Sequence, residues 1–524
     1  MGQPQYTRAG TLWYVSDGLI WDRFPPEYRG ADGRPRECSS KLFVLNPQRR
    51  SARVTARFYH TDRPPTARSF TVRAGAIETL ELATMNEVPH RQSFWIALES
   101  SLAVFPQACH EDYRGWDPVP DALIAPAPYP GPLADETRWV FPDCFNMAPR
   151  LGMSWYEQET LSLLNPNKER VSVRVRYLLR AFDGAAEETV EIPAERVAQL
   201  DVWARGPSLN GERKGPPVHM ANSYEYVVHL DATAPVIAQT TRRARWAGEA
   251  SVIGARSTMG FPLRRGSHDL WHYPAGEIVD RGILPRATPA QHPLSQCDNT
   301  WNLLFIHNLD EQRDAEAKVT FHKSSGDRTV GGPIRVPAGK SSLDCLHAPP
   351  WLGQHIQVNE PFGMTLTADR PVVPEICGAE FEMWSQVCPG SMSAVNFYPG
   401  PLKGERTWWL GIGRAGGRDD LNVEWRQSYH LLNPGRTKVR VTLHFLGLGR
   451  SGNALTHTVD LARGGVARVD SADVPGLPVD RPFAVRAEGD GAFCAQAFIR
   501  TFTRGLPHSR AMSSMIGVPM SLHP

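Results

Sequence analysis

His430 to Phe445, HLLNPGRTKVRVTLHF, is the stretch that decides the fold, because the chain repeats its pattern three more times. The other copies are Leu42 to Phe58 (LFVLNPQRRSARVTARF), Leu163 to Tyr177 (LLNPNKERVSVRVRY) and Phe305 to Phe321 (FIHNLDEQRDAEAKVTF). In each copy an apolar run ends at an Asn, a polar turn follows, and a strand of alternating apolar residues leaves the turn. This order predicts a β-hairpin.

The strand after the turn keeps one apolar face. In the fourth copy Val439, Leu443 and Phe445 lie at even distances from Asn433, so their side chains point to the same side of a strand. The third copy has its apolar residues one position later, which predicts a turn longer by one residue. The Asn itself is more typical of a turn than of a site, because its side chain bonds locally and tolerates left-handed backbone.

The copies are spaced at the scale of domains. Successive Asn residues are about 119, 143 and 125 residues apart, well beyond the 20–50 residues of solenoid repeats. Other landmarks recur in the same order: an aromatic entry strand, a turn like Val-Pro-Ala-Gly, a strand like Val-Val-x-Gln and an exit like Gly-x-Pro-Leu. We therefore expect an all-β chain of four tandem antiparallel β-sandwiches, jelly-roll-like, over residues 1–133, 134–263, 264–402 and 403–524.

The composition of the chain limits the classes of function that we expect. The chain has 524 residues and a net charge of only +2, which argues against a nucleic-acid partner. Its eight cysteines form no C-x-x-C pair, as expected of buried thiols in a reducing compartment. The N-terminal stretch lacks an apolar signal core, and no apolar run reaches the roughly 18–20 residues of a membrane span. We expect a cytoplasmic protein with no metal site and no cofactor.

One segment carries a family resemblance. Residues 236 to 242, VIAQTTR, and the landmarks above resemble the sensory rhodopsin transducer family. The resemblance implies small cytoplasmic β-sandwiches that assemble as fourfold rings, have the shape of carbohydrate-binding modules, and have proposed roles in signal transduction and DNA binding. Four fused copies then imply a pseudo-fourfold ring in a single chain, a pseudo-tetramer that needs no second chain.

The copies depart from the family where the family has a His before Thr-Arg. The corresponding residues are Ala108, Thr240, Ile376 and Ala497. Fusion allows copies to diverge, so a site could be built from unlike walls. The segment after each Val-Val-x-Gln strand differs most between copies and is rich in charged and aromatic residues, and loops on a β scaffold commonly carry function.

These divergent segments supply the candidate site residues. The candidates for acid/base catalysis are Glu375, Glu380, Glu382, His110, Glu111 and Asp112. The candidates for ligand binding are Trp116, Arg242, Arg245, Trp246, Trp384, Arg500, Arg504 and His508.

Three interpretations of the charged segments stay open. The charges can pair across the junctions between copies and only hold the ring together. They can bind a carbohydrate or a small anionic metabolite without turnover, with tryptophans as stacking platforms. They can supply the two carboxyl groups of a glycoside hydrolase or a related enzyme. We favour binding, keep the enzyme as the alternative and a structural scaffold as the third, and leave a protein partner open.

Overall fold

The computed structural model describes residues 11–19, 38–89, 92–113, 120–133, 136–146, 155–180, 185–202, 224–246, 252–263, 268–278, 300–381, 389–402, 404–418, 422–448, 455–479, 481–504 and 510–519. These residues form antiparallel β-sheets, one short helix, α1 (Trp351–Gln354), and short 3-10 turns such as η1 (Leu82–Thr84) and η4 (Ser471–Asp473). The prediction of an all-β protein is therefore confirmed.

The strands fall into four successive groups, which we call the first to fourth units. The first unit contains β1 (Leu12–Leu19), β2 (Cys38–Leu45), β3 (Ala52–Tyr59), β4 (Thr66–Val72), β5 (Ile77–Glu81), β6 (Ser93–Ser100), β7 (Phe105–Tyr113), β8 (Pro120–Ile124) and β9 (Tyr129–Pro130). The second contains β10 (Arg138–Asn146), β11 (Trp155–Asn165), β12 (Val171–Leu179), β13 (Ala185–Ile192), β14 (Arg196–Asp201), β15 (Tyr224–Ala232), β16 (Ile237–Trp246), β17 (Val252–Met259) and β18 (Phe261–Pro262).

The later units repeat this order. The third contains β19 (Leu270–Gly276), β20 (Thr300–Asn308), β21 (Ala315–Lys323), β22 (Arg328–Val336), β23 (Ser341–Cys345), β24 (Phe362–Ala368), β25 (Val372–Phe381), β26 (Pro389–Asn396) and β27 (Tyr398–Pro399). The fourth contains β28 (Thr407–Gly413), β29 (Gly416–Arg418), β30 (Val423–Leu432), β31 (Val439–Leu446), β32 (Leu455–Leu461), β33 (Val466–Asp470), β34 (Phe483–Gly489), β35 (Cys494–Thr503), β36 (Ala511–Ile516) and β37 (Val518–Pro519).

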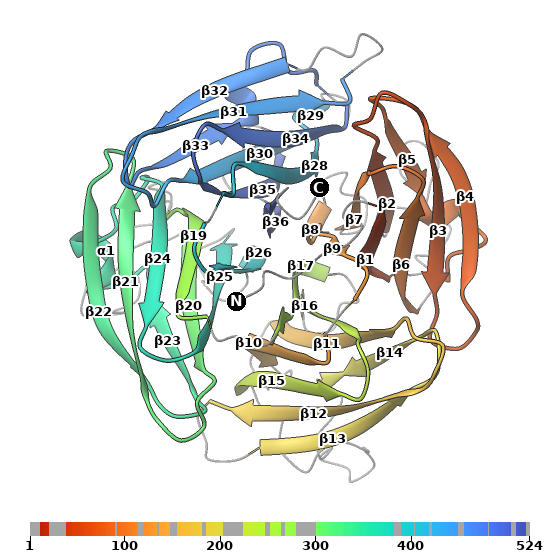
Figure 1. The fold of residues 1–524 in the computed structure, drawn as a ribbon, viewed down its shortest axis with the longest axis horizontal. Helices are drawn as coiled ribbons and strands as arrows, with labels where there is room; N and C mark the ends of the chain where they lie inside the picture. Colours follow the sequence, from red (N-terminus) through yellow and green to blue (C-terminus); the bar gives the residue numbers. More distant parts are fainter. Residues whose placement is uncertain are drawn as a thin grey trace.

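Each unit has two sheets. The first sheets have five strands each, in the orders β4-β3-β6-β1-β9, β13-β12-β15-β10-β18, β22-β21-β24-β19-β27 and β32-β31-β34-β28-β37. The second sheets, which we call the smaller sheets, have four strands in the first three units, in the orders β5-β2-β7-β8, β14-β11-β16-β17 and β23-β20-β25-β26. In the fourth unit this sheet has the order β29-β30-β35-β36 with β33 also paired to β30, so the three-residue strand β29 makes it five-stranded. The first sheets lie on the outside of the molecule and the smaller sheets face its middle (Figure 1).

The Asn of each hairpin is fully buried and closes the turn. Its side-chain nitrogen donates to the carbonyl four residues later in the first, second and fourth copies, and five residues later in the third, where Asn308 reaches Arg313. The prediction of a longer third turn is confirmed. The same nitrogen also donates to a carbonyl at the start of the Val-Pro-Ala-Gly-like turn, for example that of Val336. The Asn therefore ties two turns together.

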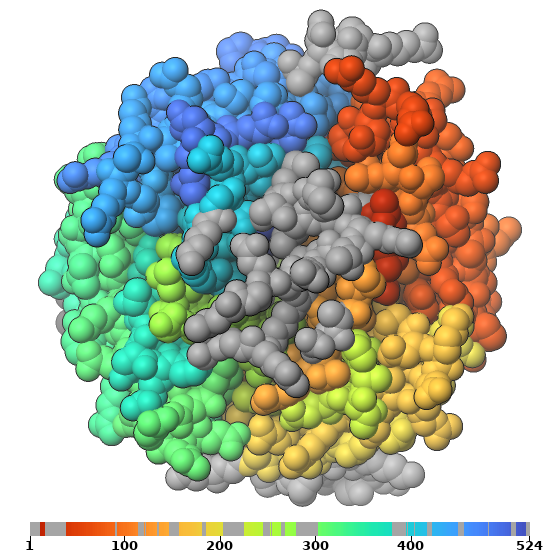
Figure 2. All heavy atoms as spheres, in the orientation of Figure 1, coloured from red at the N-terminus to blue at the C-terminus, as the bar shows by residue number. Residues whose placement is uncertain are grey.

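Neighbouring units pack in one direction. The first strand of each unit contacts the long strand of a neighbour's smaller sheet: β1 contacts β16, β10 contacts β25, β19 contacts β35 and β28 contacts β7. The hydrophobic core continues across these contacts, as where Phe105 stacks on Trp409 at a ring-centroid distance of 5.3 Å. The first unit adjoins the fourth in the space-filling view (Figure 2).

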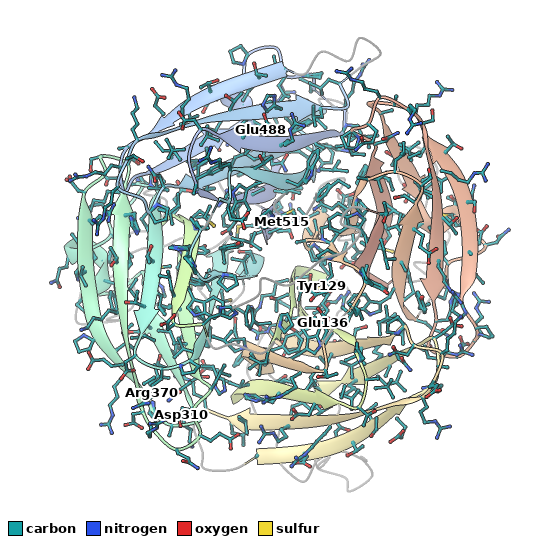
Figure 3. All side chains as sticks on the ribbon, viewed as in Figure 1. Tyr129, Glu136, Asp310, Arg370, Glu488 and Met515 are labelled. Atoms are coloured by element: carbon teal, nitrogen blue, oxygen red, sulfur yellow. The ribbon has the colours of Figure 1, made fainter. Side chains whose placement is uncertain are left out.

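The last strand of each smaller sheet lies near the middle of the molecule. Here β8, β17, β26 and β36 contact one another. Met515 on β36 is labelled near this middle in Figure 3, and its sulfur accepts a hydrogen bond from Gln107 of the first unit at 3.4 Å.

A second link recurs where one unit leads into the next: Tyr129 donates to Glu136 at 3.0 Å, and Tyr398 donates to Glu405 at 3.1 Å.

Candidate functional site

One buried polar position is common to the four units. Six residues before each hairpin Asn lies a polar side chain that is at most 6% exposed: Ser40, Glu159, Asn302 and Gln427. The residues opposite them on the next strand differ between units and are His110, Arg242, Gly378 and Ile499, respectively. In the first two units this polar residue therefore faces a predicted site residue, His110 or Arg242. In the last two units it faces a residue that has no polar side chain.

In the first unit this position forms a chain of three polar groups. Ser40 Oγ lies 2.6 Å from His110 Nδ1, and His110 Nε2 lies 3.1 Å from Asp112 Oδ1. The residue types are those of a Ser-His-Asp relay. The three residues are only 2–3% exposed, so a substrate could not reach the serine without a rearrangement.

Glu111 does not belong to this chain, because neighbouring residues on a strand point to opposite faces. Its carboxylate accepts a hydrogen bond from Tyr113 at 2.9 Å and lies 3.7 Å from the Lys41 ammonium. Burial would raise the pKa of Glu111, but Lys41 and Arg414 hold that pKa below its ordinary value. Glu111 and Asp112 thus occupy two separate environments and do not face each other.

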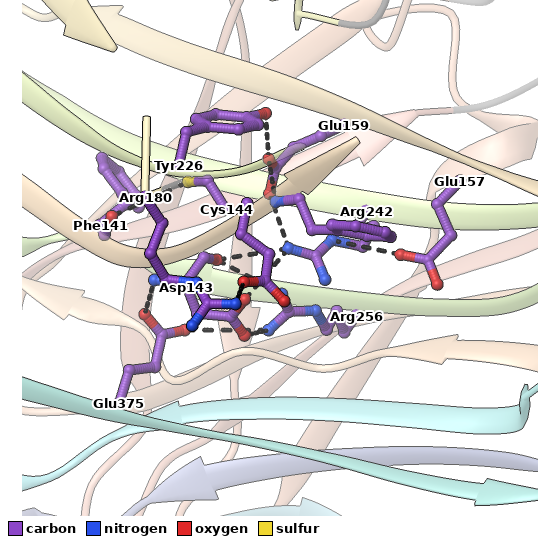
Figure 4. A network of polar contacts seen from close by, with 12 residues as sticks. Phe141, Asp143, Cys144, Glu157, Glu159, Arg180, Tyr226, Arg242, Arg256 and Glu375 are labelled. Carbon is purple, nitrogen blue, oxygen red and sulfur yellow. Dashed lines mark hydrogen bonds and ion pairs between the residues drawn. The ribbon is translucent and has the colours of Figure 1, made fainter. Parts of the chain in front are cut away.

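The junction of the second and third units holds a larger ionic network (Figure 4). Asp143 on β10 is its centre: its carboxylate lies 2.6 Å from Arg256 Nη1 and 3.2 Å from Arg242 Nη2. Both guanidinium groups also donate to the backbone carbonyl of Asp143, at 3.3 and 3.4 Å. These side chains are at most 6% exposed, so the charges are paired with almost no contact with solvent.

Two glutamates of β11 extend the network. Arg242 Nε lies 3.6 Å from Glu157, and Arg242 Nη2 lies 3.7 Å from Glu159. Glu159 also accepts hydrogen bonds from the Tyr226 hydroxyl and from the backbone of Phe145. Burial raises the pKa of both glutamates, against the opposing effect of Arg242.

The third unit contributes Glu375, which is fully buried. Its carboxylate accepts a hydrogen bond from the Asp143 backbone at 3.4 Å and lies 3.9 Å from Arg256 Nη1. The first unit has Gln107 at the corresponding position, and its side-chain oxygen accepts a bond from the backbone of Ile412 at the junction with the fourth unit. Glu375 is therefore an acidic variant of a glutamine that links neighbouring units.

The environment separates the pKa values of the two central carboxyls. Burial, and then the charge of Asp143, raise the pKa of Glu375 to about 8. Burial would also raise the pKa of Asp143, but Arg256 and Arg242 outweigh it and hold the value below the ordinary range. Both carboxyls contact Arg256 Nη1, so the contacting oxygens lie within about 6.5 Å of each other, a limit that includes the spacing of retaining glycosidase pairs.

The other predicted site residues are placed as follows. Arg500 lies at the junction of the third and fourth units, where its guanidinium is 4.9 Å from the Phe498 ring centroid, and Arg504 is exposed just beyond β35. Glu380 on β25, and Arg245 and Trp246 on β16, have side chains outside the described residues. Trp116, Glu382, Trp384 and His508 lie outside the described residues altogether.

Sequence reasoning missed most of the network. It selected Arg242 and Glu375 but not Asp143, Glu157, Glu159 or Arg256, because these four precede or follow the divergent segments. The position of Asp143 in the sequence did carry a signal, because Asp143 is the fourth residue after the entry tryptophan Trp139. Ile412 holds the same position after Trp408. Each of the two residues donates its backbone N–H to the glutamate or glutamine of a neighbouring unit.

The junction of the third and fourth units contains a groove of about 400 Å³. Its lining residues are Leu270, His272, Thr320, His322, Arg328, Thr365, Pro401, Leu402, Pro434, Gly435 and Ala492. At the two preceding junctions an arginine crosses to the next unit from the position of Thr320: Arg57 reaches Glu195 at 2.8 Å, and Arg176 reaches Glu311 at 3.3 Å. The shorter Thr320 leaves this space open.

The polar groups of the groove are held in place. Thr365 Oγ1 lies 3.1 Å from His272 Nδ1 and 2.8 Å from His322 Nε2, and His322 Nδ1 lies 3.0 Å from the carbonyl of Gly464. Burial lowers the pKa of both histidines to about 4, so they are neutral at pH 7. Arg328 donates to the carbonyl of Gly435 at 2.9 Å and supplies the positive charge of the groove.

The described residues contain no group of three or more His, Cys, Asp or Glu side chains that could hold a metal ion. Within the same ranges, no helix has the length and apolar character needed to cross a membrane.

Comparison with known proteins gives limited structural similarity. No family model matches the chain, and no curated protein matches it either. Among solved structures, Thermotoga maritima 1070 is 20% identical over 26% of this chain and 100% of that chain, with a TM-score of 0.19. The Anabaena sensory rhodopsin transducer is 20% identical over 19% of this chain and 85% of that chain, with a TM-score of 0.16.

Proposed function

We propose that this protein binds a small hydroxylated anion, such as a sugar acid, in the groove between its third and fourth units. The observation that carries the proposal is the groove itself, whose volume of about 400 Å³ falls in the range of small-molecule sites. It exists because Thr320 stands where two other units have an arginine that crosses the junction. Divergence between copies thus provides a site at one junction.

The lining fits this ligand class. The half-buried hydroxyls of Thr320 and Thr365 are groups that exchange hydrogen bonds with ligand hydroxyls, and the buried imidazoles of His272 and His322 hold Thr365 in place behind them. The exposed Arg328 guanidinium can pair with a carboxylate in a bidentate manner. Leucine and proline side chains supply an apolar wall for the carbon face of a sugar ring.

The scaffold in this proposal is a pseudo-fourfold ring of jelly-roll-like β-sandwiches, a single-chain version of the tetramer implied by the resemblance to sensory rhodopsin transducers. The corresponding strand orders of the four units, which differ only by the additional strand β29 in the fourth, support it, as do the contacts of each first strand with a neighbour's long strand. A cytoplasmic location and a protein partner stay predictions.

A carbohydrate-active enzyme is the second candidate. One observation favours it: the environment raises the pKa of Glu375 and lowers that of Asp143, and such a separation is typical of acid/base pairs. The side chains of this pair are at most 1% exposed, which favours an ion pair between units. If turnover exists, it requires these carboxyls to become accessible.

The binding proposal is tested by the thermal stability of the full chain with sugar acids, neutral sugars and nucleotides. A ligand that binds only the native state raises Tm by mass action. At a ligand concentration one hundred times Kd, the free energy of unfolding rises by about 2.7 kcal/mol. We expect a rise with sugar acids and a smaller one with neutral sugars. Product analysis of any hit separates a binder from an enzyme.

The matched variants are Thr320→Arg, which restores the arginine of the first two units, and Val358→Arg, which adds the same charge at an exposed position outside the groove. Thr320→Arg should abolish the rise in Tm, and Val358→Arg should preserve it. A rise that survives Thr320→Arg would show that the ligand binds elsewhere and would overturn the groove as the site.

A further inference from the structure

One hydroxyl of the groove, that of Thr365, lies between two imidazoles. In the outer sheet of the third unit, Thr365 pairs with Thr320 on one side and with His272 on the other, so these side chains form a row across three strands. His322 is two residues after Thr320 and therefore lies on the same face. Thr365 Oγ1 is 3.1 Å from His272 Nδ1 and 2.8 Å from His322 Nε2.

The corresponding row differs in every other unit. Its middle residue, at the position of Thr365, is Ala97 in the first unit, His229 in the second and Arg486 in the fourth. Only the third unit has a hydroxyl at this middle position. The hydroxyl occurs at the same junction as the open groove.

The carbonyl of Gly464 in the fourth unit determines where the protons of this row lie. A carbonyl oxygen only accepts hydrogen bonds, so His322 Nδ1, which is 3.0 Å from it, carries a proton. Burial lowers the pKa of His322 to about 4, so at pH 7 the ring has a single proton and its Nε2 has a lone pair. The Thr365 hydroxyl therefore donates its proton to His322 Nε2.

The contact with His272 completes the order. The hydroxyl of Thr365 has one proton, which His322 Nε2 accepts, so His272 Nδ1 must donate to Thr365 Oγ1. One lone pair of Thr365 Oγ1 then remains. In the described part of the chain this oxygen has no third hydrogen-bond partner.

This order makes Thr365 an acceptor, and not a donor, toward the groove. A ligand hydroxyl can donate to the remaining lone pair, whereas a ketone oxygen, an ether oxygen or a fluorine atom at the same place meets it lone pair to lone pair. A site that is built to bond a ligand hydroxyl discriminates strongly against an analogue without it, because a polar group is then left unpaired.

We propose that Thr365 is the specificity-determining residue of the groove and selects ligands that donate a hydroxyl proton to its Oγ1. This inference rests on the proposed function of the groove and narrows the ligand class. The ligand is a hydroxylated carboxylate whose carboxylate pairs with Arg328 and whose hydroxyl donates to Thr365. Keto acids, which present only acceptor oxygens at this place, are disfavoured.

The probes are D-glucuronate and D-galacturonate with their monodeoxyfluoro analogues, in each of which fluorine replaces one hydroxyl. The half-saturating concentration of the rise in Tm should be at least about tenfold higher for one analogue than for its parent acid. Thr365→Val should raise the half-saturating concentration of the parent acid to that of the analogue. Thr367→Val, which removes an exposed hydroxyl of the same strand outside the groove, should leave both values unchanged.

Nitrogen-15 NMR of the full chain with labelled histidine tests the proton order without a ligand. At pH 7 the rings of His272 and His322 should both carry their proton on Nδ1, and the signals lost in His272→Gln and His322→Gln identify the two rings. If Thr365→Val does not fold, Thr365→Ser keeps the hydroxyl and should restore both the proton order and the selectivity.

A proton on Nε2 of either ring, or equal half-saturating concentrations for all fluorinated analogues, would overturn Thr365 as the selecting residue and leave the groove as a binding site. The absence of any rise in Tm with both parent acids would overturn the groove itself and this inference with it. The two failures are therefore distinguishable.

Discussion

At the scale of single residues, the hairpin Asn shows how one side chain organises a unit. In the fourth unit Asn433 donates to the carbonyls of Thr437 at 2.7 Å and Ala462 at 2.9 Å, and it accepts from the backbone of Gly435 at 3.0 Å. It is fully buried, so water cannot replace these bonds. Its role as a turn former was predictable because Asn bonds to nearby backbone.

Asn433→Ala should therefore destabilise the protein by about 2–4 kcal/mol, because two backbone carbonyls lose a donor in a place that excludes solvent. Urea unfolding measures the change. Thr442→Ala, which removes only an exposed hydroxyl pair with Thr458, is the control and should change stability by less than about 0.5 kcal/mol. Equal effects of the two substitutions would contradict the structural role of the Asn.

Glu375 departs from the glutamine found at this position in the other units, and the pH dependence of stability tests its state. The folded pKa of about 8 lies above the ordinary value, so the native protein holds an extra proton between about pH 4.5 and 8. Stability from this group is therefore present at low pH and is lost as pH rises through 8. Glu375→Gln mimics the protonated acid and should remove that loss.

The measurement is urea unfolding of wild type and Glu375→Gln from pH 5 to 9. The two proteins should have similar stability at pH 5, and the variant should be the more stable at pH 9. If the curves remain parallel, Glu375 is ionised across the range. The enzyme candidate adds a separate expectation, that the variant loses turnover while it stays folded.

At the scale of elements, the junction between β10 and β25 depends on a buried ionic network rather than on apolar packing alone. The Asp143 carboxylate on β10 contacts the Arg256 guanidinium on β17 of the same unit. The Asp143 backbone N–H donates to the Glu375 carboxylate of the next unit. Removal of one partner from such a buried pair leaves an uncompensated charge, which typically costs more than the pair contributes.

Arg256→Met should accordingly cost about 3–5 kcal/mol, because Asp143 is left buried with one fewer counter-charge. Denaturant unfolding, followed by signals from the second and third units, measures the loss in the free energy of unfolding. The control is Arg174→Met, which breaks the exposed ion pair with Glu187 and should have little effect. A small effect of Arg256→Met would indicate that solvent reaches the network.

At the scale of the whole molecule, buried neutral histidines recur in several units. His229 Nε2 lies 2.7 Å from His307 Nε2 between the second and third units, and burial lowers the pKa of His229 to about 3. Burial also lowers the pKa of His322, His347 and His60 to about 4. Each of these groups must gain a proton when the chain unfolds in acid.

The protein should therefore lose stability steeply as pH falls from 6.5 to 4. In this window the unfolded chain binds more protons than the native one, because the folded pKa values are below the ordinary 6.5, so stability rises with pH. Circular dichroism and size-exclusion chromatography from pH 7 to 4 follow the transition. Stability that stays constant across the window would mean that these histidines are accessible to protons in the native state.

Much of the fold was readable from the sequence, and less of the site was. Hairpins, apolar faces and turn residues depend on neighbours in the chain, so the repeated pattern around Asn433 predicted them correctly. Arg242 and Glu375 were also selected, because the divergent segments are charged. Arg256 was not, because nothing in its own segment indicates that it meets the carboxylate of Asp143.

The sequence by itself determined that the chain is all-β and that one turn chemistry recurs four times, because a hairpin is specified by residues within a few positions of each other. Only the tertiary structure decided which charges meet. Glu375 is 232 residues from Asp143, and Arg256 is 113 residues from it. Their contact depends on how two units pack. The groove at the next junction exists for the same reason: side-chain size matters there only once the units are in contact.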